Sequence, residues 1–306
     1  MGMTAVQQRT LDQLMGREEQ RPTFRPEFPS ELAEQIEKRV GPALESRDEG
    51  DPLLVTKGRL ADLHQRCEGL YLANHLGEGA FEYGFRLAVG KVVHKAVEVG
   101  VYARRLSEAE LVERVIERLA VDDTAFGNYV GVMDPIDRAE LEAEAVRLTQ
   151  VFRATFPPLE KSWTPSVEMP HKAELAGGRL LLHSRPDLSL GGTDPDEPLR
   201  ARRLLVELKT GPDRPEHDED VRFYALVAAL FFGVPPFRVA TVHLESGRWR
   251  HQDVTEDTLR SAARRVADGC LRALAVLGGE APRLRGGPWC GWCPRSSTCP
   301  SSSVRG

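Results

Sequence analysis

Two acidic residues and a lysine stand close together in segments that read as β-strands. Asp187 follows the run LLLHSRP, and Glu207 and Lys209 belong to the run LLVELKTG. Residues two apart in a strand point to the same face, so Glu207 and Lys209 should project together while Leu208 faces apolar packing. If the two strands pair as a hairpin, Asp187 can meet Glu207. Converging carboxylates repel unless a hard cation such as Mg²⁺ or Mn²⁺ neutralises them.

This combination has the parts needed to hydrolyse a phosphodiester, because a lysine beside the metal site could assist the attacking water. The alternative is a salt bridge between Glu207 and Lys209 on an exposed sheet face. Both charges stand in an otherwise apolar strand, where an unused charge is costly, and this favours a site.

A second group of residues that could do chemistry lies at the C-terminus, where Cys290, Cys293 and Cys299 have the spacing C-x2-C-x5-C. This is one thiolate short of a tetrahedral site, so a fourth ligand must come from elsewhere in the fold. Cys67 and Cys270 are the two candidates. The tail has too little apolar content to order itself, and a metal centre would staple it to an earlier part of the chain.

The composition is that of a globular protein outside the membrane, with 41% hydrophobic and 28% charged residues. No apolar run is long enough to cross a bilayer, and no secretory signal pattern stands at the N-terminus, so we expect a cytoplasmic protein. Five cysteines in such a chain favour metal or redox chemistry over disulfides. A net charge of −5 does not exclude nucleic-acid binding, because local basic patches and bound cations outweigh the sum.

Hydrophobic spacing and end signals predict the elements that must position these residues. One helix is expected over 31–45 with Ser30 as its N-cap, and another begins after Thr56 and carries Cys67 on its inner face. Further expected helices cover 83–101, two segments that start with the capping boxes Ser107-x-x-Glu110 and Asp137-x-x-Glu140, 216–232, and 255–277. The expected strands cover 165–174, 178–186, 202–209 and 237–246.

The order of these elements predicts an α/β fold, a central mixed sheet flanked by helices. An N-terminal helical and linker segment, 1–52, should precede the main domain, 53–306. Within that domain we expect a helical insertion at about 102–156 and the cysteine-bearing tail at 278–306.

In this order the motifs resemble the PD-(D/E)xK nucleases of the RecB type, over nearly the whole chain. The resemblance is greatest to the branch that carries an iron–sulfur cluster, as in the AddB nuclease domain and the CRISPR-adaptation nucleases. It is carried by Cys67, the segment from Gly90 through His94 to Glu98, Pro186-Asp187, Glu207-Leu208-Lys209, Tyr224, and the three terminal cysteines.

The resemblance implies a restriction-endonuclease-like fold and a metal-dependent DNA nuclease of repair, recombination or CRISPR adaptation, acting on ends or single strands. Mg²⁺ or Mn²⁺ would be held by Asp187, Glu207 and the Leu208 carbonyl, with His94 as a further ligand or a guide for the water. Lys209 would assist the water, and Tyr224 would contact DNA or support the site. The 4Fe–4S cluster would be bound by Cys67, Cys290, Cys293 and Cys299.

Some positions depart from the family pattern. Asp220 stands where a glutamine is usual, and Ser184-Arg185 precede Pro186-Asp187 where a glycine is usual. A non-catalytic DNA-binding or scaffold subunit of a repair complex is therefore the alternative, and a zinc-stapled structural protein is a third. The chain has no Walker motif, so any helicase would be a separate protein. Glu168 and Glu174 lie on a strand before Asp187, and either could join the acidic site, but both are expected to be surface charges. His217 is expected to be a structural or surface residue.

Overall fold

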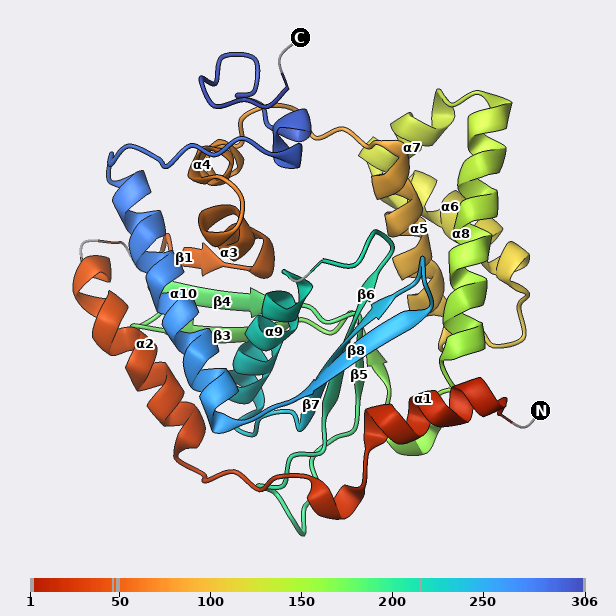
Figure 1. Ribbon diagram of the computed structural model, residues 1–306, viewed down its shortest axis with the longest axis horizontal. Coiled ribbons are helices and arrows are strands. Elements are labelled where there is room, and N and C mark those ends of the chain that lie inside the picture. Colours follow the sequence, from red (N-terminus) through yellow and green to blue (C-terminus); the bar gives the residue numbers. More distant parts are fainter. Residues whose placement is uncertain (1–2, 46, 48–49, 215, 305–306) are drawn as a thin grey trace.

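The computed structural model describes residues 3–45, 47, 50–214 and 216–304, and it shows two mixed sheets with helices around them (Figure 1). The larger sheet has the order β2-β5-β6-β7-β8, in which β6 and β7 run parallel and the other neighbours antiparallel. The smaller sheet has the order β1-β4-β3, with β1 parallel to β4. The expected α/β class is confirmed, but its single central sheet is divided into two.

The strand and helix bounds are as follows. The strands are β1 Leu53–Val55, β2 Ser166–Val167, β3 His171–Leu175, β4 Leu180–Ser184, β5 Leu188–Leu190, β6 Leu204–Lys209, β7 Arg238–His243 and β8 Arg248–Asp253. The α-helices are α1 Ala5–Met15, α2 Phe28–Leu44, α3 Lys57–His64, α4 Glu68–His75, α5 Phe85–Gly100, α6 Glu108–Asp122, α7 Thr124–Gly131, α8 Pro135–Thr155, α9 His217–Phe232 and α10 Glu256–Leu277. Short 3-10 turns cover Glu18–Gln20, Lys161–Trp163 and Pro288–Trp292. No helix among the described residues has the length and apolarity needed to span a bilayer.

The helices form two groups on different sides of the sheets. Helices α2 and α10 pack together, α9 lies against both sheets, and α5, α6 and α8 form a separate block beside the larger sheet (Figure 1). The core strand β6 is buried from Leu204 to Leu208, which explains why its apolar run is nearly continuous.

Several expected helix ends are confirmed and others are wrong. The capping box at Ser107 is present, and Thr255 caps α10. The box expected at Asp137 is wrong, because Asp134 caps α8 and Pro135 occupies its first turn, where the missing N–H costs nothing. Helix α2 begins at Phe28, before the expected cap Ser30. Helix α1, with its own capping box at Thr4, was missed.

The strands that carry the acidic residues are shorter than expected. The segment 178–186 ends at Ser184 and joins the smaller sheet, so it does not pair with β6. Pro186 has no N–H to donate, and the chain starts a separate strand, β5, which forms the antiparallel pair with β6 instead. The segment 165–174 is likewise divided into β2 and β3, and strand β8 was missed.

The helix expected to carry Cys67 on its inner face is also interrupted. Helix α3 ends at His64, and Cys67 has the extended backbone of the residue that precedes α4. Its carbonyl accepts hydrogen bonds from the amides of Leu70 and Tyr71. The break takes Cys67 out of a helix face, and its thiol lies toward the C-terminal tail, where the Arg285 amide is 3.4 Å away.

Candidate active site

Asp187 and Glu207 are brought together by the pairing of β5 with β6. Asp187 immediately precedes β5, and its Oδ2 accepts a hydrogen bond from the Leu208 amide at 2.6 Å. Both acidic side chains are buried, with relative exposures of 8% and 2%. The expected meeting of the two residues therefore occurs, although through β5 and not through the longer strand before it.

His94 reaches the same point from the middle of α5. Its Nδ1 lies 2.6 Å from Asp187 Oδ1. Burial alone would lower the pKa of His94, but the charge and hydrogen bond of Asp187 raise it overall. Burial would in turn raise the pKa of Asp187, yet His94, Lys57 and the Leu208 amide hold it below its usual value. Each group thus keeps the other charged in a place where neither would be charged alone.

Two lysines share one oxygen of Glu207. Lys209 Nζ lies 3.0 Å from Glu207 Oε1, and Lys57, from the first turn of α3, binds the same oxygen. Burial alone would lower the pKa of Lys57, but the nearby carboxylates raise it overall. The other oxygen of Glu207, Oε2, is buried and has no hydrogen-bond partner. A buried carboxylate oxygen without a partner is costly, so Oε2 is available to a cation.

The residue that departs from the family pattern, Asp220, also contacts this site. It lies in the first turn of α9 and forms an ion pair with Lys209 at 2.7 Å. One turn further along, Tyr224 is 2% exposed, and Lys57 Nζ lies 5.0 Å from the centre of its ring. Burial, followed by the charges of Glu207 and Asp187, raises the pKa of Tyr224 well above its usual value. Tyr224 is therefore neutral and is buried beside the charged groups.

Glu168 belongs to this group, and the expectation that it is a surface charge is wrong. One ligand atom from each of His94, Glu168 and Asp187 lies within 4.8 Å of the others. Burial and then the charge of Asp187 raise the pKa of Glu168 to about 7. Its backbone adopts φ +50°, a conformation in which non-glycine residues are strained and which concentrates at functional sites. Glu174, by contrast, is exposed as expected.

Sequence reasoning missed Lys57, and it named Glu168 as a possible member of the site but favoured a surface position. Lys57 directly follows the helix-capping Thr56, where a lysine is ordinary, and it is 150 residues from its partner Glu207. Glu168 stands at a turn after a two-residue strand, and only its left-handed backbone distinguishes it. Neither residue has a local sequence signal, because both reach the site through the packing of distant elements.

A hard divalent cation fits these residues. Two carboxylates and one imidazole, those of Glu168, Asp187 and His94, have ligand atoms within 4.8 Å of one another. The carboxylate of Glu207, whose Oε2 has no hydrogen-bond partner, is near enough to act electrostatically on His94. Mg²⁺ and Mn²⁺ prefer oxygen ligands of this kind. The residues placed to hold such an ion are His94, Glu168, Asp187 and Glu207.

The four cysteines expected to act together lie in one neighbourhood. Burial and then the charges of Cys67, Cys290 and Cys299 raise the pKa of the Cys293 thiol. Backbone amides point at the sulfur atoms: Arg285 N lies 3.4 Å from Cys67 Sγ, and hydrogen bonds from the backbone of Ser303 and Gly287 lower the pKa of Cys290. Amide groups aimed at sulfur favour the thiolate form, which is the form that binds metals.

Cys270, the rival fourth ligand, has different surroundings. It is fully buried within α10, and burial raises its pKa to about 12. Cys270 lies near Tyr71, whereas Cys67 lies near Cys293. Cys270 is therefore a protonated core thiol.

Ion pairs hold the C-terminal tail, residues 278–304, against α4, the segment after α4, and α10 (Figure 1). Buried Glu68 binds the Arg272 guanidinium at 2.6 and 2.8 Å and accepts the Arg283 amide at 2.6 Å. Glu78 pairs with Arg295. The approach is close, because a Cβ at Gly69 would lie 2.7 Å from Leu284. The tail thus meets the region that contains Cys67.

Comparison with known proteins defines the class of this chain. The family profile of the PD-(D/E)XK nuclease superfamily matches residues 60–300, so the chain belongs to that superfamily. The mixed α/β architecture agrees with its restriction-endonuclease-like fold.

The search of curated proteins found no match. Among solved structures, the chain is similar to a protein from Eubacterium rectale that is provisionally designated an exonuclease, with 14% identity and a TM-score of 0.46. That alignment covers 78% of this chain and 88% of the other.

Proposed function

We propose that this protein is a metal-dependent deoxyribonuclease of the RecB type, from the branch that carries a 4Fe–4S cluster. The observation that supports this most strongly is the convergence of His94, Asp187, Glu207 and Lys209 on one buried point, in a chain of the nuclease superfamily. Three elements that are distant in sequence, α5, β5 and β6, deliver these residues.

Each residue has a role in this proposal. Asp187, Glu207, His94 and the Leu208 carbonyl hold Mg²⁺ or Mn²⁺, and Glu168 adds a further carboxylate. The bound ion would polarise a phosphate oxygen and lower the pKa of water. Lys209 orients the attacking water and donates to the developing charge on phosphorus. Lys57 compensates the charge of Glu207, and Tyr224 supports the group from below.

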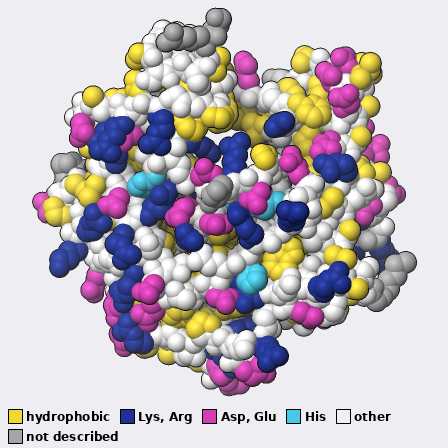
Figure 2. Space-filling view, viewed as in Figure 1, with side chains coloured by type: hydrophobic (Ala, Val, Ile, Leu, Met, Phe, Trp, Pro, Cys, Tyr) yellow, Lys and Arg dark blue, Asp and Glu magenta, His cyan; other side chains and the backbone are white. Residues whose placement is uncertain are grey.

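The surface around the site supports a nucleic-acid substrate. Figure 2 shows a hollow between the surface over α3 and α4 and the surface over α5, with Lys and Arg side chains around it. Two aromatic rings are exposed where the connection between α4 and α5 contacts the tail: Phe81 in the connection at 63% and Trp292 in the tail at 60%. Exposed rings can stack on unpaired bases, so we propose single strands or frayed ends as the substrate.

Cleavage of labelled single-stranded DNA by the purified full chain, with Mg²⁺ or Mn²⁺, tests this function. The variants Asp187→Ala and Lys209→Ala should lose activity, whereas Glu174→Ala and Lys172→Ala remove the same charges from exposed positions and should retain it. Unchanged cleavage by the first pair would refute the assigned site.

A non-catalytic DNA-binding subunit of a repair or adaptation complex is the second candidate. It is favoured by the ion pairs of Lys209 with both Glu207 and Asp220, which hold the lysine on two carboxylates. DNA binding without turnover, tested anaerobically with several divalent metals, would select this function. The variant Asp220→Gln, which restores the residue usual in the family, would then be expected to raise activity.

We propose that Cys67, Cys290, Cys293 and Cys299 bind the 4Fe–4S cluster. Their common neighbourhood and the amides that point at their sulfurs support this. Anaerobically purified protein should be brown, absorb near roughly 400 nm, and contain iron and sulfide. A colourless protein with one zinc per chain at the cysteines would select the zinc staple instead.

A further inference from the structure

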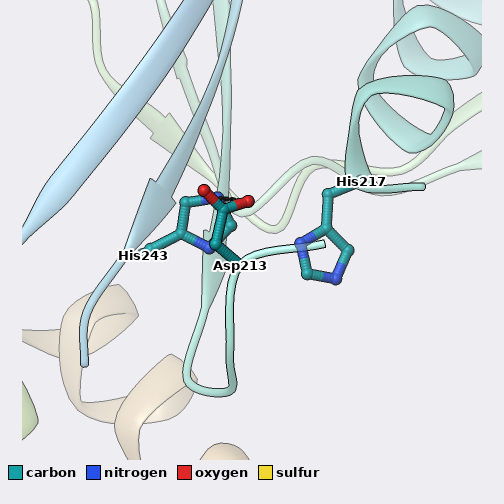
Figure 3. A group of neighbouring side chains, drawn as sticks. All are labelled: Asp213, His217 and His243. Atoms are coloured by element: carbon teal, nitrogen blue, oxygen red, sulfur yellow. Dashed lines mark ion pairs between the residues drawn. The ribbon is translucent and has the colours of Figure 1, made fainter. Parts of the chain in front are cut away.

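A second group of potential metal ligands lies beside the acidic site, formed by Asp213, His217 and His243 (Figure 3). His243 is the last residue of β7 and is paired in register with Lys209, while His217 is the first residue of α9. Asp213 comes from the connection between β6 and α9. One ligand atom from each of the three lies within 4.8 Å of the others.

Three ring nitrogens of the two imidazoles are buried without the partners that burial normally requires. His243 is 1% exposed, and neither of its ring nitrogens has a hydrogen-bond partner. Its Nε2 lies 3.2 Å from Asp213 Oδ1 without the alignment of a hydrogen bond. Nδ1 of His217 is also buried and unpaired, and its ring stacks on that of His243 at 5.4 Å. A buried polar atom without a partner destabilises the fold by about 1–3 kcal/mol, and a bound ligand would remove this cost at these nitrogens.

The protonation state of the group also suits a metal. Burial, with a contribution from the charge of Lys209, lowers the pKa of His217 to about 4, and burial lowers that of His243. Both rings are therefore neutral near pH 7 and have a free lone pair. The carboxylate of Asp213 is half-exposed and also contacts the Arg250 guanidinium at 2.8 Å, which occupies the open side of the group.

We propose that Asp213, His217 and His243 bind a divalent transition-metal ion, of which Zn²⁺ is the best fit. Two imidazole nitrogens and one carboxylate oxygen are a donor set that Zn²⁺ uses, with water completing the tetrahedron. Mg²⁺ prefers oxygen donors, so this site and the acidic site select different ions. Metal binding would require Arg250, whose side chain is 41% exposed, to release Asp213.

Such an ion would tie the connection between β6 and α9 to the end of β7. That connection begins directly after Lys209 and leads to Asp220, so the ion would stabilise the segment that joins these two residues. The proposal concerns metal binding and does not depend on nuclease activity.

Zinc binding by the metal-stripped full chain tests this. The variants His217→Gln and Asp213→Asn should retain one zinc per chain fewer than the wild type after dialysis, with affinity at this site reduced at least about 100-fold. His251→Gln, which removes an exposed histidine of β8, should bind as the wild type does. The cysteines can take up the same amount of zinc in every variant. The measured quantity is therefore the difference in zinc per chain between each variant and the wild type.

Circular dichroism establishes that each variant is folded, and Asp213→Asn, at a half-exposed position, gives a second reading if His217→Gln is unstable. A full equivalent retained by both folded variants overturns the proposal. Displacement of this zinc by a tenfold excess of Mg²⁺ would overturn it too, because a site with two imidazoles should discriminate against Mg²⁺.

Discussion

The acidic site and the cysteine tail are held in place by different forces. The strands that deliver Asp187 and Glu207 lie in the core, where Leu188, Val206 and Leu208 are at most 1% exposed. The tail has almost no core of its own: among its described residues after Gly278, Cys290 alone is buried. Ion pairs attach it to α4, the segment after α4, and α10, and the four thiols proposed to bind the cluster share one neighbourhood.

Because of this difference, variants in the acidic site and variants in the tail should have different effects on activity and stability. Side chains positioned by a packed core can be replaced without moving their neighbours, so variants in the acidic site should change activity more than stability. Side chains that themselves make the attachment cannot be replaced in that way. Variants in the tail should therefore release it and change activity only indirectly.

The largest effect is expected for Lys209→Met, which removes the proposed water-orienting group. Cleavage should fall by about 10²–10⁴-fold, the usual contribution of a positioned acid or base. The melting temperature should change little, because Lys57 remains on Glu207 Oε1. Single-turnover cleavage rates and thermal denaturation of the same sample measure both quantities.

The matched variant is Lys57→Met, which removes the other lysine on the same oxygen. Since Lys57 compensates charge and is not proposed to touch the water, its loss should reduce cleavage about tenfold. Equal losses in the two variants would mean that the lysines share one role, and the division between them would then be wrong.

The next largest effect is expected for Cys293→Ser in the tail. Loss of one thiolate should remove the absorbance near roughly 400 nm and make residues 278–304 accessible to protease. Cleavage per folded molecule at low temperature should remain within several-fold of the wild type. A variant as stable and as protease-resistant as the wild type would contradict the stapling role of the cysteines.

The sequence predicted which residues meet in the acidic site better than it predicted the strand pairing that positions them. Asp187, Glu207, Lys209 and His94 were identified from an order of motifs, and the structure brings them together. The hairpin expected to unite them was wrong, because Pro186 divides the strand and β5 pairs with β6 in its place. Local signals identified residues that the structure brings together, whereas sheet pairing depends on contacts between distant segments.

The residues that sequence reasoning missed or placed at the surface depend on tertiary structure alone. Lys57 contacts Glu207 only because α3 packs near α9, and Glu168 joins Asp187 only because β2 pairs with β5. His243 and His217 likewise meet because one ends β7 and the other begins α9. No spacing within the sequence indicates these encounters.

A smaller effect in the tail is expected for Glu68→Gln. Glu68 is 3% exposed and binds both Arg272 and the Arg283 amide, and removal of one partner of a buried ion pair costs about 3–5 kcal/mol. Arg272 keeps its contact with Glu280, so we expect about 3 kcal/mol, seen in chemical denaturation and in faster amide exchange of the tail. Glu280→Gln, at a residue whose side chain is 57% exposed, should cost less than about 1 kcal/mol.

The smallest effect is expected for Glu168→Gln in the acidic site, and it appears as a pH dependence. Because the pKa of Glu168 is raised to about 7, the carboxyl is protonated below pH 7 and must release its proton to bind a cation. The affinity for Mn²⁺ should thus fall as pH drops below 7, by at most about tenfold per pH unit for this one proton.

In Glu168→Gln the pH dependence of the Mn²⁺ affinity that is due to Glu168 should be absent. The pH dependence due to His94, whose pKa is also raised, should remain. Mn²⁺ titrations between pH 5.5 and pH 8, at roughly constant ionic strength, measure the slope, with Glu174→Gln as the exposed control. An identical slope in variant and wild type would place Glu168 outside the metal site. The acidic site would then consist of His94, Asp187 and Glu207, the three side-chain ligands that the sequence indicated.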